Sequence, residues 1–330
     1  MTESGADAAA SGRGFFRPLA AQTAFAQFWF ALPEYRFTER ALARLPTPRA
    51  TLYFAADVKE RASGNAIGTG VFCEGPHSKH FEVTHECADM VAVKVKSGAL
   101  GALLGVPARD LRDQTVNLAE VWGRRATELT EQIQEARTLE QRLRLLQTAL
   151  VRNYRPHERQ DALASEVAST IERRAGKVRI AEIGERIGVG RRALLQQFDA
   201  CVGLTPKQYA RVIRLRATVT RLVTTDAADW ARLSNELGYY DQSHMIHEFR
   251  DLLGIPPAIF RRQLAAFRPV GSPAFGRRAL PKREQDLYRL LGMVSEWAEN
   301  ASNQEAVSIG ANGSAAVKTP SDSAGFRPDP

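Results

Sequence analysis

The stretch that decides the fold reads IAEIGERIGVGRRALLQQFDACVGLTPKQYARVIRLRAT over residues 180–218 and LSNELGYYDQSHMIHEFRDLLGIPPAIFRR over residues 233–262. The two segments repeat one pattern of apolar, glycine and proline positions. Leu194, Phe198, Gly203 and Tyr209 of the first correspond to Met245, Phe249, Gly254 and Phe260 of the second, each 51 residues later. A repeat of this kind indicates a duplicated supersecondary unit.

Each copy predicts a helix, a tight turn and a second helix. In the first copy, Ile183 and Ile187 are spaced as on one helix face, and Gly188 ends the helix where left-handed backbone is needed. Small residues, Gly184 and Ser234, lie four positions before the turn glycines and leave room for a crossing helix. The pattern predicts two helix-turn-helix units with different exposed faces, which suits an asymmetric reader of the DNA major groove.

The same two segments resemble the AraC/XylS-type DNA-binding domain over residues 160–265. The most specific part is GYYDQSHM at residues 238–245, followed by Phe249 and by GIPP at residues 254–257. The resemblance implies a transcription regulator whose two recognition helices enter successive major grooves. It also implies a rigid helix at about residues 206–223 that joins the two units.

The resemblance further implies which side chains face the DNA. They are Arg191, Arg192, Leu195 and Gln196 in the first unit and Gln242, Ser243, Ile246 and His247 in the second. Arg suits guanine, Gln suits adenine, and an aliphatic side chain suits the thymine methyl group. A solvated helix face is the alternative for the two arginines. The family usually has Ser at Gly190 and commonly Arg at Gln196 and His247, so these departures leave the target sequence undetermined.

Other conspicuous residues of this region receive structural or open assignments. We expect His244, Tyr209 and Phe260 to be structural, the last two as matched core residues. Lys207, Arg211 and Arg214 are open between contact with DNA phosphates and simple solvation.

Composition places few limits on the function. The 330 residues suggest two or three domains, and 45 Lys and Arg against 37 Asp and Glu give a net charge of +8. Residues 157–268 carry 18 Lys and Arg and 13 Asp and Glu, an excess of +5, which suits a polyanionic partner. A basic surface without a partner is the alternative. Three cysteines, no long apolar run and no secretory signal favour a cytoplasmic, nucleoid-associated protein.

The N-terminal half predicts a mixed sheet and helix domain, so the expected fold class is α+β. Residues 50–96 predict an antiparallel sheet or small barrel, in which Val91, Val93 and Val95 alternate with more polar residues as in a half-buried strand. Aromatic residues between 15 and 37 predict core. Ser97 is expected to cap a short helix that ends at Gly105.

A helical hairpin is predicted next, over residues 118–136 and from a capping box at Thr138 and Gln141 onward. It serves either as a dimerisation surface or as a cover for the sheet. The N-terminal half also contains VAVKVKSGALGALLGVPARDL at residues 91–111 and VNLAEVWG at residues 116–123. Through these segments, residues 15–150 resemble, more weakly, the uncharacterised N-terminal domain of some AraC-type proteins, which implies a sensing or assembly role.

The predicted domain boundaries follow from these segments. They are a disordered tail at 1–14, a sensing or dimerisation domain at 15–151, a linker at 152–160, the double helix-turn-helix domain at 161–268 with a first helix at 161–175, and a mostly disordered tail at 269–330 with a helix at 282–300.

One other cluster offers an alternative function. Cys73, His77, His80, His85 and Cys87 provide five metal-ligand side chains within 15 residues, as a metal- or thiol-responsive regulator would need. Their spacing matches no standard zinc finger, so we assign no metal and no cofactor. The sequence has no nucleophile elbow, phosphate-binding Walker loop or HExxH helix, and we do not expect an enzyme.

The expected partners follow from the regulator assignment. They are double-stranded promoter DNA, RNA polymerase if the protein is an activator, an unidentified small-molecule effector and, as one of two open oligomeric states, a second copy of the chain. No membrane partner is expected.

Overall fold

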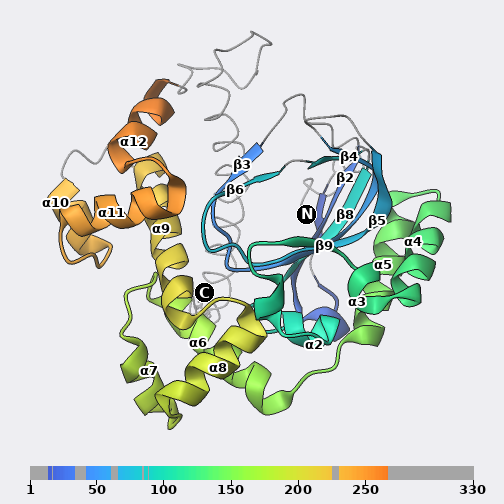
Figure 1. Cartoon of the computed structure of the whole chain (residues 1–330), viewed down its shortest axis with the longest axis horizontal. Helices are drawn as coiled ribbons and strands as arrows, with labels where there is room; N and C mark the ends of the chain where they lie inside the picture. The colour runs from blue at the N-terminus through green and yellow to red at the C-terminus, as the bar shows by residue number, and fades with distance from the viewer. Residues whose placement is uncertain are drawn as a thin grey trace, which may run out of the picture.

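The chain folds into a sheet-rich N-terminal part and a helical C-terminal part, which confirms the α+β class (Figure 1). The computed structural model describes residues 14–16, 18–33, 42–60, 66–83, 85–87, 89–224 and 230–266. The predicted tails at 1–14, apart from Gly14, and at 269–330, with the helix at 282–300, lie outside the described residues.

The N-terminal strands form an antiparallel sheet in the order β1-β2-β8-β4-β5-β9, with β7 also paired to β4 and a separate pair β3-β6. The strands are β1 Gly14–Phe16, β2 Ala26–Pro33, β3 Leu42–Arg44, β4 Thr51–Glu60, β5 Ala66–Glu74, β6 Phe81–Val83, β7 His85–Glu86, β8 Asp89–Val95 and β9 Thr115–Asn117. Among the described strands, no pairing joins the edges β1 and β9, so the described strands pair as an open sheet and do not close into a barrel.

Strand β8 has buried residues on both of its faces, which corrects the half-buried prediction for this strand. Val91, Val93 and Val95 lie in the larger core, as their alternation predicted. On the opposite face, Met90 and Ala92 are also buried, in a second cluster with residues of β4 and β5. The alternation was correct, but the intervening positions also pack against side chains.

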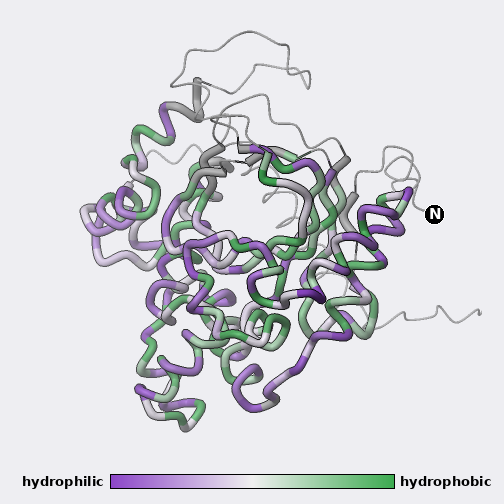
Figure 2. The backbone as a smooth tube through the Cα atoms, turned by 45° about the vertical axis from the view of Figure 1, so that its right-hand side comes forward, coloured by the Kyte–Doolittle hydropathy of each residue, from purple (hydrophilic) through white to green (hydrophobic). Residues whose placement is uncertain are grey.

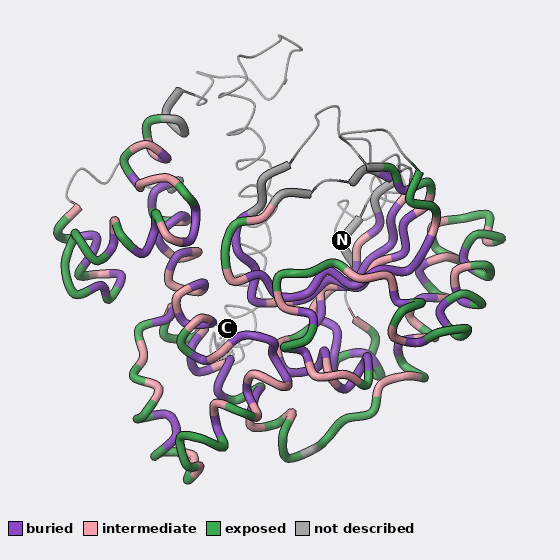
Figure 3. The backbone as a smooth tube through the Cα atoms, in the orientation of Figure 1, coloured by how far each residue is buried: buried purple, intermediate pink, exposed green. Residues whose placement is uncertain are grey.

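Helices cover one face of the sheet. They are η1 Ala20–Gln22, α2 Leu100–Leu104, η2 Ala108–Leu111, α3 Ala119–Trp122, α4 Arg124–Glu135 and α5 Leu139–Asn153. Thr138 and Gln141 form the predicted capping box at the start of α5. Leu129 and Ile133 of α4 and Leu146 of α5 are buried in the core of the sheet, while the outer turns are exposed and hydrophilic (Figures 2 and 3). The apolar faces of this hairpin therefore cover the sheet.

In the N-terminal part, the prediction of core aromatic residues is correct, whereas the prediction that Ser97 caps a helix is wrong. Phe25 and Trp29 are fully buried, as expected of core aromatics, although the strand β2 that carries Trp29 was not predicted. Ser97 does not cap α2. Its hydroxyl instead lies 2.7 Å from the hydroxyl of Tyr209, 112 residues away.

The C-terminal part consists of α6 Glu158–Arg173, α7 Ile180–Ile187, α8 Arg191–Val202, α9 Pro206–Thr224, α10 Trp230–Glu236, α11 Gln242–Leu253 and α12 Pro257–Ala266. Because α5 ends at Asn153 and α6 begins at Glu158, the non-helical connection is shorter than the predicted 152–160 linker. None of the helices in the described ranges is long and apolar enough to span a bilayer.

Each helix-turn-helix unit has its own core. Val167 and Ile171 of α6 pack with α7, α8 and the start of α9 in the first core. Leu215 and Val219, later in α9, pack with α10, α11 and α12 in the second. Helix α9 is therefore shared by both units, and in Figure 1 it runs between them.

Candidate DNA-reading site

The two turns of the repeat have the same backbone geometry. Gly188 and Gly238 both have left-handed φ angles, of 72° and 77°. The next residue of each turn donates its backbone N–H to the equivalent carbonyl, from Val189 to Gly184 at 3.0 Å and from Tyr239 to Ser234 at 2.9 Å. The predicted helix-turn-helix motif is therefore present twice.

Matched aromatic pairs fix each second helix on the helix that follows it. The rings of Phe198 and Tyr209 lie 5.5 Å apart at 88°, and those of Phe249 and Phe260 lie 5.6 Å apart at 67°. All four side chains are fully buried, as predicted for Tyr209 and Phe260. Edge-to-face aromatic packing of this kind adds about 1 kcal/mol to the burial of the rings.

The eight sequence-predicted DNA-facing residues form equivalent pairs, one member on α8 and the other on α11. The pairs are Arg191 with Gln242, Arg192 with Ser243, Leu195 with Ile246 and Gln196 with His247. In each pair the two members have the same exposure. Leu195 and Ile246 are half-buried, and the other six are exposed. The two units thus present the same positions to solvent with different chemistry.

The two candidate reading helices, α8 and α11, begin differently. Asp241 caps α11, because its carboxylate accepts the backbone N–H of His244 at 2.7 Å. Gly190 occupies the corresponding place before α8 and offers no side-chain cap. Only the second helix therefore has a side chain that fixes its first turn.

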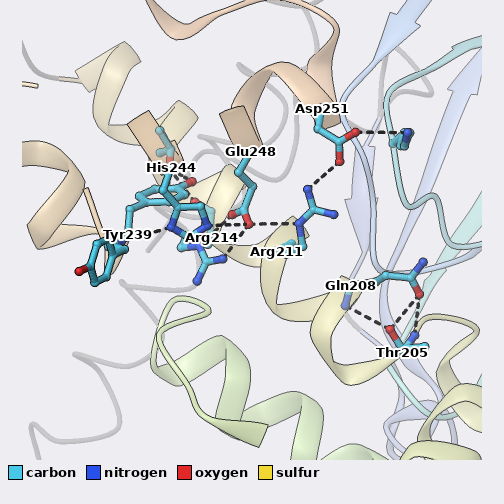
Figure 4. Close-up of polar contacts among 11 residues, drawn as sticks. Thr205, Gln208, Arg211, Arg214, Tyr239, His244, Glu248 and Asp251 are labelled. Carbon is cyan, nitrogen blue, oxygen red and sulfur yellow. Dashed lines mark hydrogen bonds and ion pairs between the residues drawn. The ribbon is translucent and has the colours of Figure 1, made fainter. Parts of the chain in front are cut away.

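Helix α9 is joined to α11 by buried ion pairs (Figure 4). The carboxylate of Glu248, only 5% exposed, accepts from Arg211 at 3.1 Å and from Arg214 at 2.8 Å. Arg211 also binds Asp251 at 2.7 Å, and this hydrogen bond holds the pKa of Asp251 below its ordinary value. Arg211 and Arg214 are therefore both engaged inside the domain, a role that is neither of the two open alternatives, phosphate contact and solvation.

The imidazole of His244 contacts two residues that precede it in the chain, Tyr239 and Tyr240. Its Nδ1 accepts the backbone N–H of Tyr240 at 3.2 Å, and its ring lies 5.5 Å from the ring of Tyr239 at 83°. Tyr239 is buried, and burial raises its pKa to about 12. These contacts are consistent with the expected structural role of His244.

Tyr240 is a surface residue that sequence reasoning passed over. Its side chain is 88% exposed, one residue before the cap of α11. The sequence offered one signal for this residue. Two tyrosines follow each other in this turn, and because Tyr239 fills the core, Tyr240 is left at the surface. An exposed ring beside the reading helix makes Tyr240 a further candidate for contact with DNA.

A model of the helix-turn-helix domain family matches residues 183–263. This range contains both turns, the helices α8 and α11 and the shared helix α9. Residues 183–263 are an AraC-type helix-turn-helix domain. The AraC-type domain is a DNA-binding domain, and the chain is a DNA-binding transcription regulator.

Several solved structures resemble the chain. The DNA-binding domain of AdpA, described as a global transcriptional factor in complex with a target DNA, is 26% identical over 33% of this chain and 97% of its own, with a TM-score of 0.30. ToxT from Vibrio cholerae is 9% identical over 72% of this chain and 96% of its own, with a TM-score of 0.33. The C-terminal domain of AraT from Geobacillus stearothermophilus is 15% identical over 35% and 93%, with a TM-score of 0.30. The curated proteins give no match.

The alternative Cys and His cluster does not form a site in the part of the chain that the structure describes. Cys73 is buried on one face of the sheet and Cys87 on the other. His77 stacks on Phe81 with ring centroids 3.5 Å apart, and the side chain of His85 lies outside the described residues. Among the described side chains, no three His, Cys, Asp or Glu residues are placed to hold a metal ion. The metal-sensor alternative is therefore not supported.

Proposed function

We propose that the protein regulates transcription by reading two successive major-groove segments of promoter DNA, one with α8 and one with α11. The observation that carries this proposal is the set of four equivalent residue pairs on the two helices. Exposed polar side chains at matched positions, held by matched turns, suit two recognition helices that enter adjacent grooves.

The paired residues differ in what they can recognise. Arg192 offers the bidentate donor that suits guanine, and its counterpart Ser243 is a weak, permissive hydrogen-bonding group. Gln242 suits adenine, whereas its counterpart Arg191 carries a charge. Leu195 and Ile246 are half-buried, so only part of each side chain can touch a thymine methyl group. We therefore propose a target whose two segments differ in sequence.

Affinity for the DNA backbone must come from cations that are not engaged inside the domain. Arg211 and Arg214 are held by Glu248 and are unsuited to this role. Arg191 and Lys207 are exposed, and Tyr240 places a hydroxyl donor beside α11. We propose that these residues contact phosphates, which fix the register of the protein on DNA.

Selection from a random pool of double-stranded DNA tests this function directly. Full-length protein at a fixed, near-physiological salt concentration is expected to enrich a motif with two unlike segments about one helical turn apart. Binding that shows no enriched motif and falls steeply with salt would reduce the site to a basic surface and reject the proposal.

Arg192→Ala tests the base-reading role. It is expected to weaken binding to the selected sequence by about 1–3 kcal/mol while changing binding to unrelated DNA much less. Both affinities are measured by titration of labelled duplexes at one salt concentration. Arg124→Ala is the matched control, because Arg124 is an exposed arginine of α4 and should change neither affinity. Equal losses on both DNAs would remove Arg192 from the reading set.

We further propose that regulation enters through the N-terminal part, as a sensing or assembly domain. The support is physical contact, since α8 packs against both α2 and η2. An effector, a second copy of the chain or RNA polymerase that binds the N-terminal part would act on the reading helices through this contact. Light scattering with and without DNA distinguishes one protomer from two.

A further inference from the structure

One loop of the N-terminal part reaches both helix-turn-helix units. This loop, residues 76–80, connects β5 to β6, and we refer to it as the bridging loop. At its start, Pro76 lies against Gly203, the residue that ends α8. At its end, His80 lies against Gly254, the residue that ends α11. Gly203 and Gly254 are equivalent positions of the repeat, so the loop touches the same place on each unit.

Both contacts are close. A Cβ atom added at Gly203 would lie 2.6 Å from Cγ of Pro76, and one added at Gly254 would lie 3.2 Å from Cε1 of His80. His80 also donates its backbone N–H to the carbonyl of Leu252 at 2.9 Å, and its Nδ1 lies 3.2 Å from the same oxygen. The last turn of α11 is therefore hydrogen-bonded to the bridging loop.

Charged side chains reinforce each contact. Arg112, just after η2, donates through Nε to the carbonyl of Gly203 at 2.6 Å and pairs with Asp199 of α8. Lys79 of the bridging loop lies 3.4 Å from Asp251 of α11. Both reading helices are thus held at their C-terminal ends by the N-terminal part.

The bridging loop is itself fixed. His77 is 5% exposed, stacks on Phe81 and donates its backbone N–H to the carbonyl of Thr47 at 2.7 Å. Ser78 donates its backbone N–H to Asp113 at 2.7 Å. Because the middle of the loop is anchored in the N-terminal part, its two ends cannot move independently. Movement of one reading helix relative to the other would break contacts at one end.

We infer that the bridging loop is a template that sets the separation and rotation of the two reading helices, and that His80 and Arg112 are positioning residues for DNA spacing. This inference rests on the proposed function, because spacing matters only if both helices read DNA. Helix α9 joins the units through one covalent path and its contacts with α11. The bridging loop is a second connection between the two units, because it contacts both of them.

The test measures how strongly DNA binding depends on the spacing between the two segments of the motif. The two segments of the selected motif are placed in duplexes with the natural spacer and with spacers one or two base pairs longer or shorter. Wild-type protein is expected to prefer the natural spacer by about tenfold or more, which corresponds to about 1.4 kcal/mol. His80→Ala and Arg112→Gln are expected to reduce this preference to about threefold or less while keeping the same preferred bases in each segment.

Controls separate positioning from general stability. Arg124→Ala should retain the wild-type spacing profile. His80→Asn should restore it, because the Asn amide can place an N–H near the position of the His80 Nδ1. His80 is exposed, so His80→Ala is expected to fold even if Arg112→Gln does not. Thermal melting shows which variants are folded.

The outcomes distinguish the two proposals. If wild-type protein enriches no two-segment motif, the proposed function fails. If it does enrich such a motif but folded His80→Ala has the wild-type spacing profile, the template is rejected and the proposed function stands. A broadened profile that His80→Asn restores supports the template.

Discussion

At the scale of single residues, the three cysteines are informative because each is buried. Cys73 and Cys87 lie on opposite faces of the sheet, and Cys201 lies in the core of the first helix-turn-helix unit. Burial raises the pKa of Cys201 to about 12 and raises the pKa of Cys73 further above its ordinary value. A thiol in this state is seldom the reactive thiolate at neutral pH.

Thiol labelling is therefore expected to be slow in the folded protein. At pH 8, native protein should react with a disulfide reagent at least about tenfold more slowly than protein unfolded in urea. For Cys201, the native rate should still rise with pH above about 9, where an ordinary thiol is already largely ionised. Fast labelling of native Cys73 or Cys87 would contradict this burial and favour a thiol-responsive role.

The single-residue predictions that succeeded depended on neighbours in the sequence. Thr138 caps its helix through Gln141, three positions away, and such a local partner is visible in the chain. Ser97 was expected to act locally, yet its partner is Tyr209. Arg214 pairs with Glu248, 34 residues away. Periodicity does not disclose partners at such separations, because only the packed fold brings them together.

At the scale of elements, Glu248 joins the shared helix α9 to the second reading helix α11. It is the acceptor for Arg211 and Arg214, whose side chains are 26% and 13% exposed. Removing the carboxylate leaves two largely buried guanidinium groups with fewer acceptors, which is costly.

Glu248→Gln is expected to lower the free energy of unfolding by about 2 kcal/mol or more. Urea denaturation followed by circular dichroism measures the change. Glu128→Gln is the matched control, because Glu128 pairs with Arg124 in an exposed position and should contribute less than about 0.5 kcal/mol. Equal small losses in both variants would show that the buried pairs do not stabilise the packing of α11 on α9.

Helix boundaries in the repeat were predicted well because their signals are local. The left-handed glycines at Gly188 and Gly203 mark two helix ends directly in the sequence. The sheet was predicted less well. Strand β2 lies between β1 and β8, and β8 lies between β2 and β4. Most strands that are paired in the sheet are therefore not consecutive in the chain. Sequence alternation identified β8 but could not supply this order or the second buried face.

At the scale of the whole molecule, the N-terminal part is attached to the first helix-turn-helix unit by a polar network. Arg49 pairs with Glu172 of α6 at 2.7 Å, and Glu172 also accepts from the hydroxyl of Tyr209. That hydroxyl in turn contacts Ser97. On the second unit, Leu45 is buried in the core with α11. The two parts therefore share both polar and apolar contacts, which a prediction of separate domains did not anticipate.

A pair of glycine substitutions tests this attachment. Gly188 and Gly203 both end helices with left-handed backbone, so alanine costs about 1 kcal/mol at either position from backbone strain alone. At Gly188 the added Cβ meets nothing within 4 Å, but at Gly203 it would lie 2.7 Å from the carbonyl oxygen of Ala108. Gly203→Ala is therefore expected to cost at least about 1 kcal/mol more than Gly188→Ala.

Thermal and urea unfolding of both variants measure this difference. Gly203→Ala should also increase cleavage by protease in the connection between α5 and α6, because the N-terminal part is displaced from α8. Equal stability and equal cleavage of the two variants would show that the contact at Gly203 contributes little to holding the parts together.

The paired contacts of the bridging loop also make the two units non-interchangeable. Asp199, which Arg112 binds, corresponds in the repeat to Arg250, and Asp251, which Lys79 approaches, corresponds to Ala200. A permuted chain with the units exchanged would place Arg250 against Arg112 and leave Lys79 facing an alanine. The contacts with the N-terminal part therefore distinguish the first helix-turn-helix unit from the second. If the two segments of the DNA target differ, as proposed above, these contacts would place the N-terminal part in the same orientation relative to the two segments in every complex.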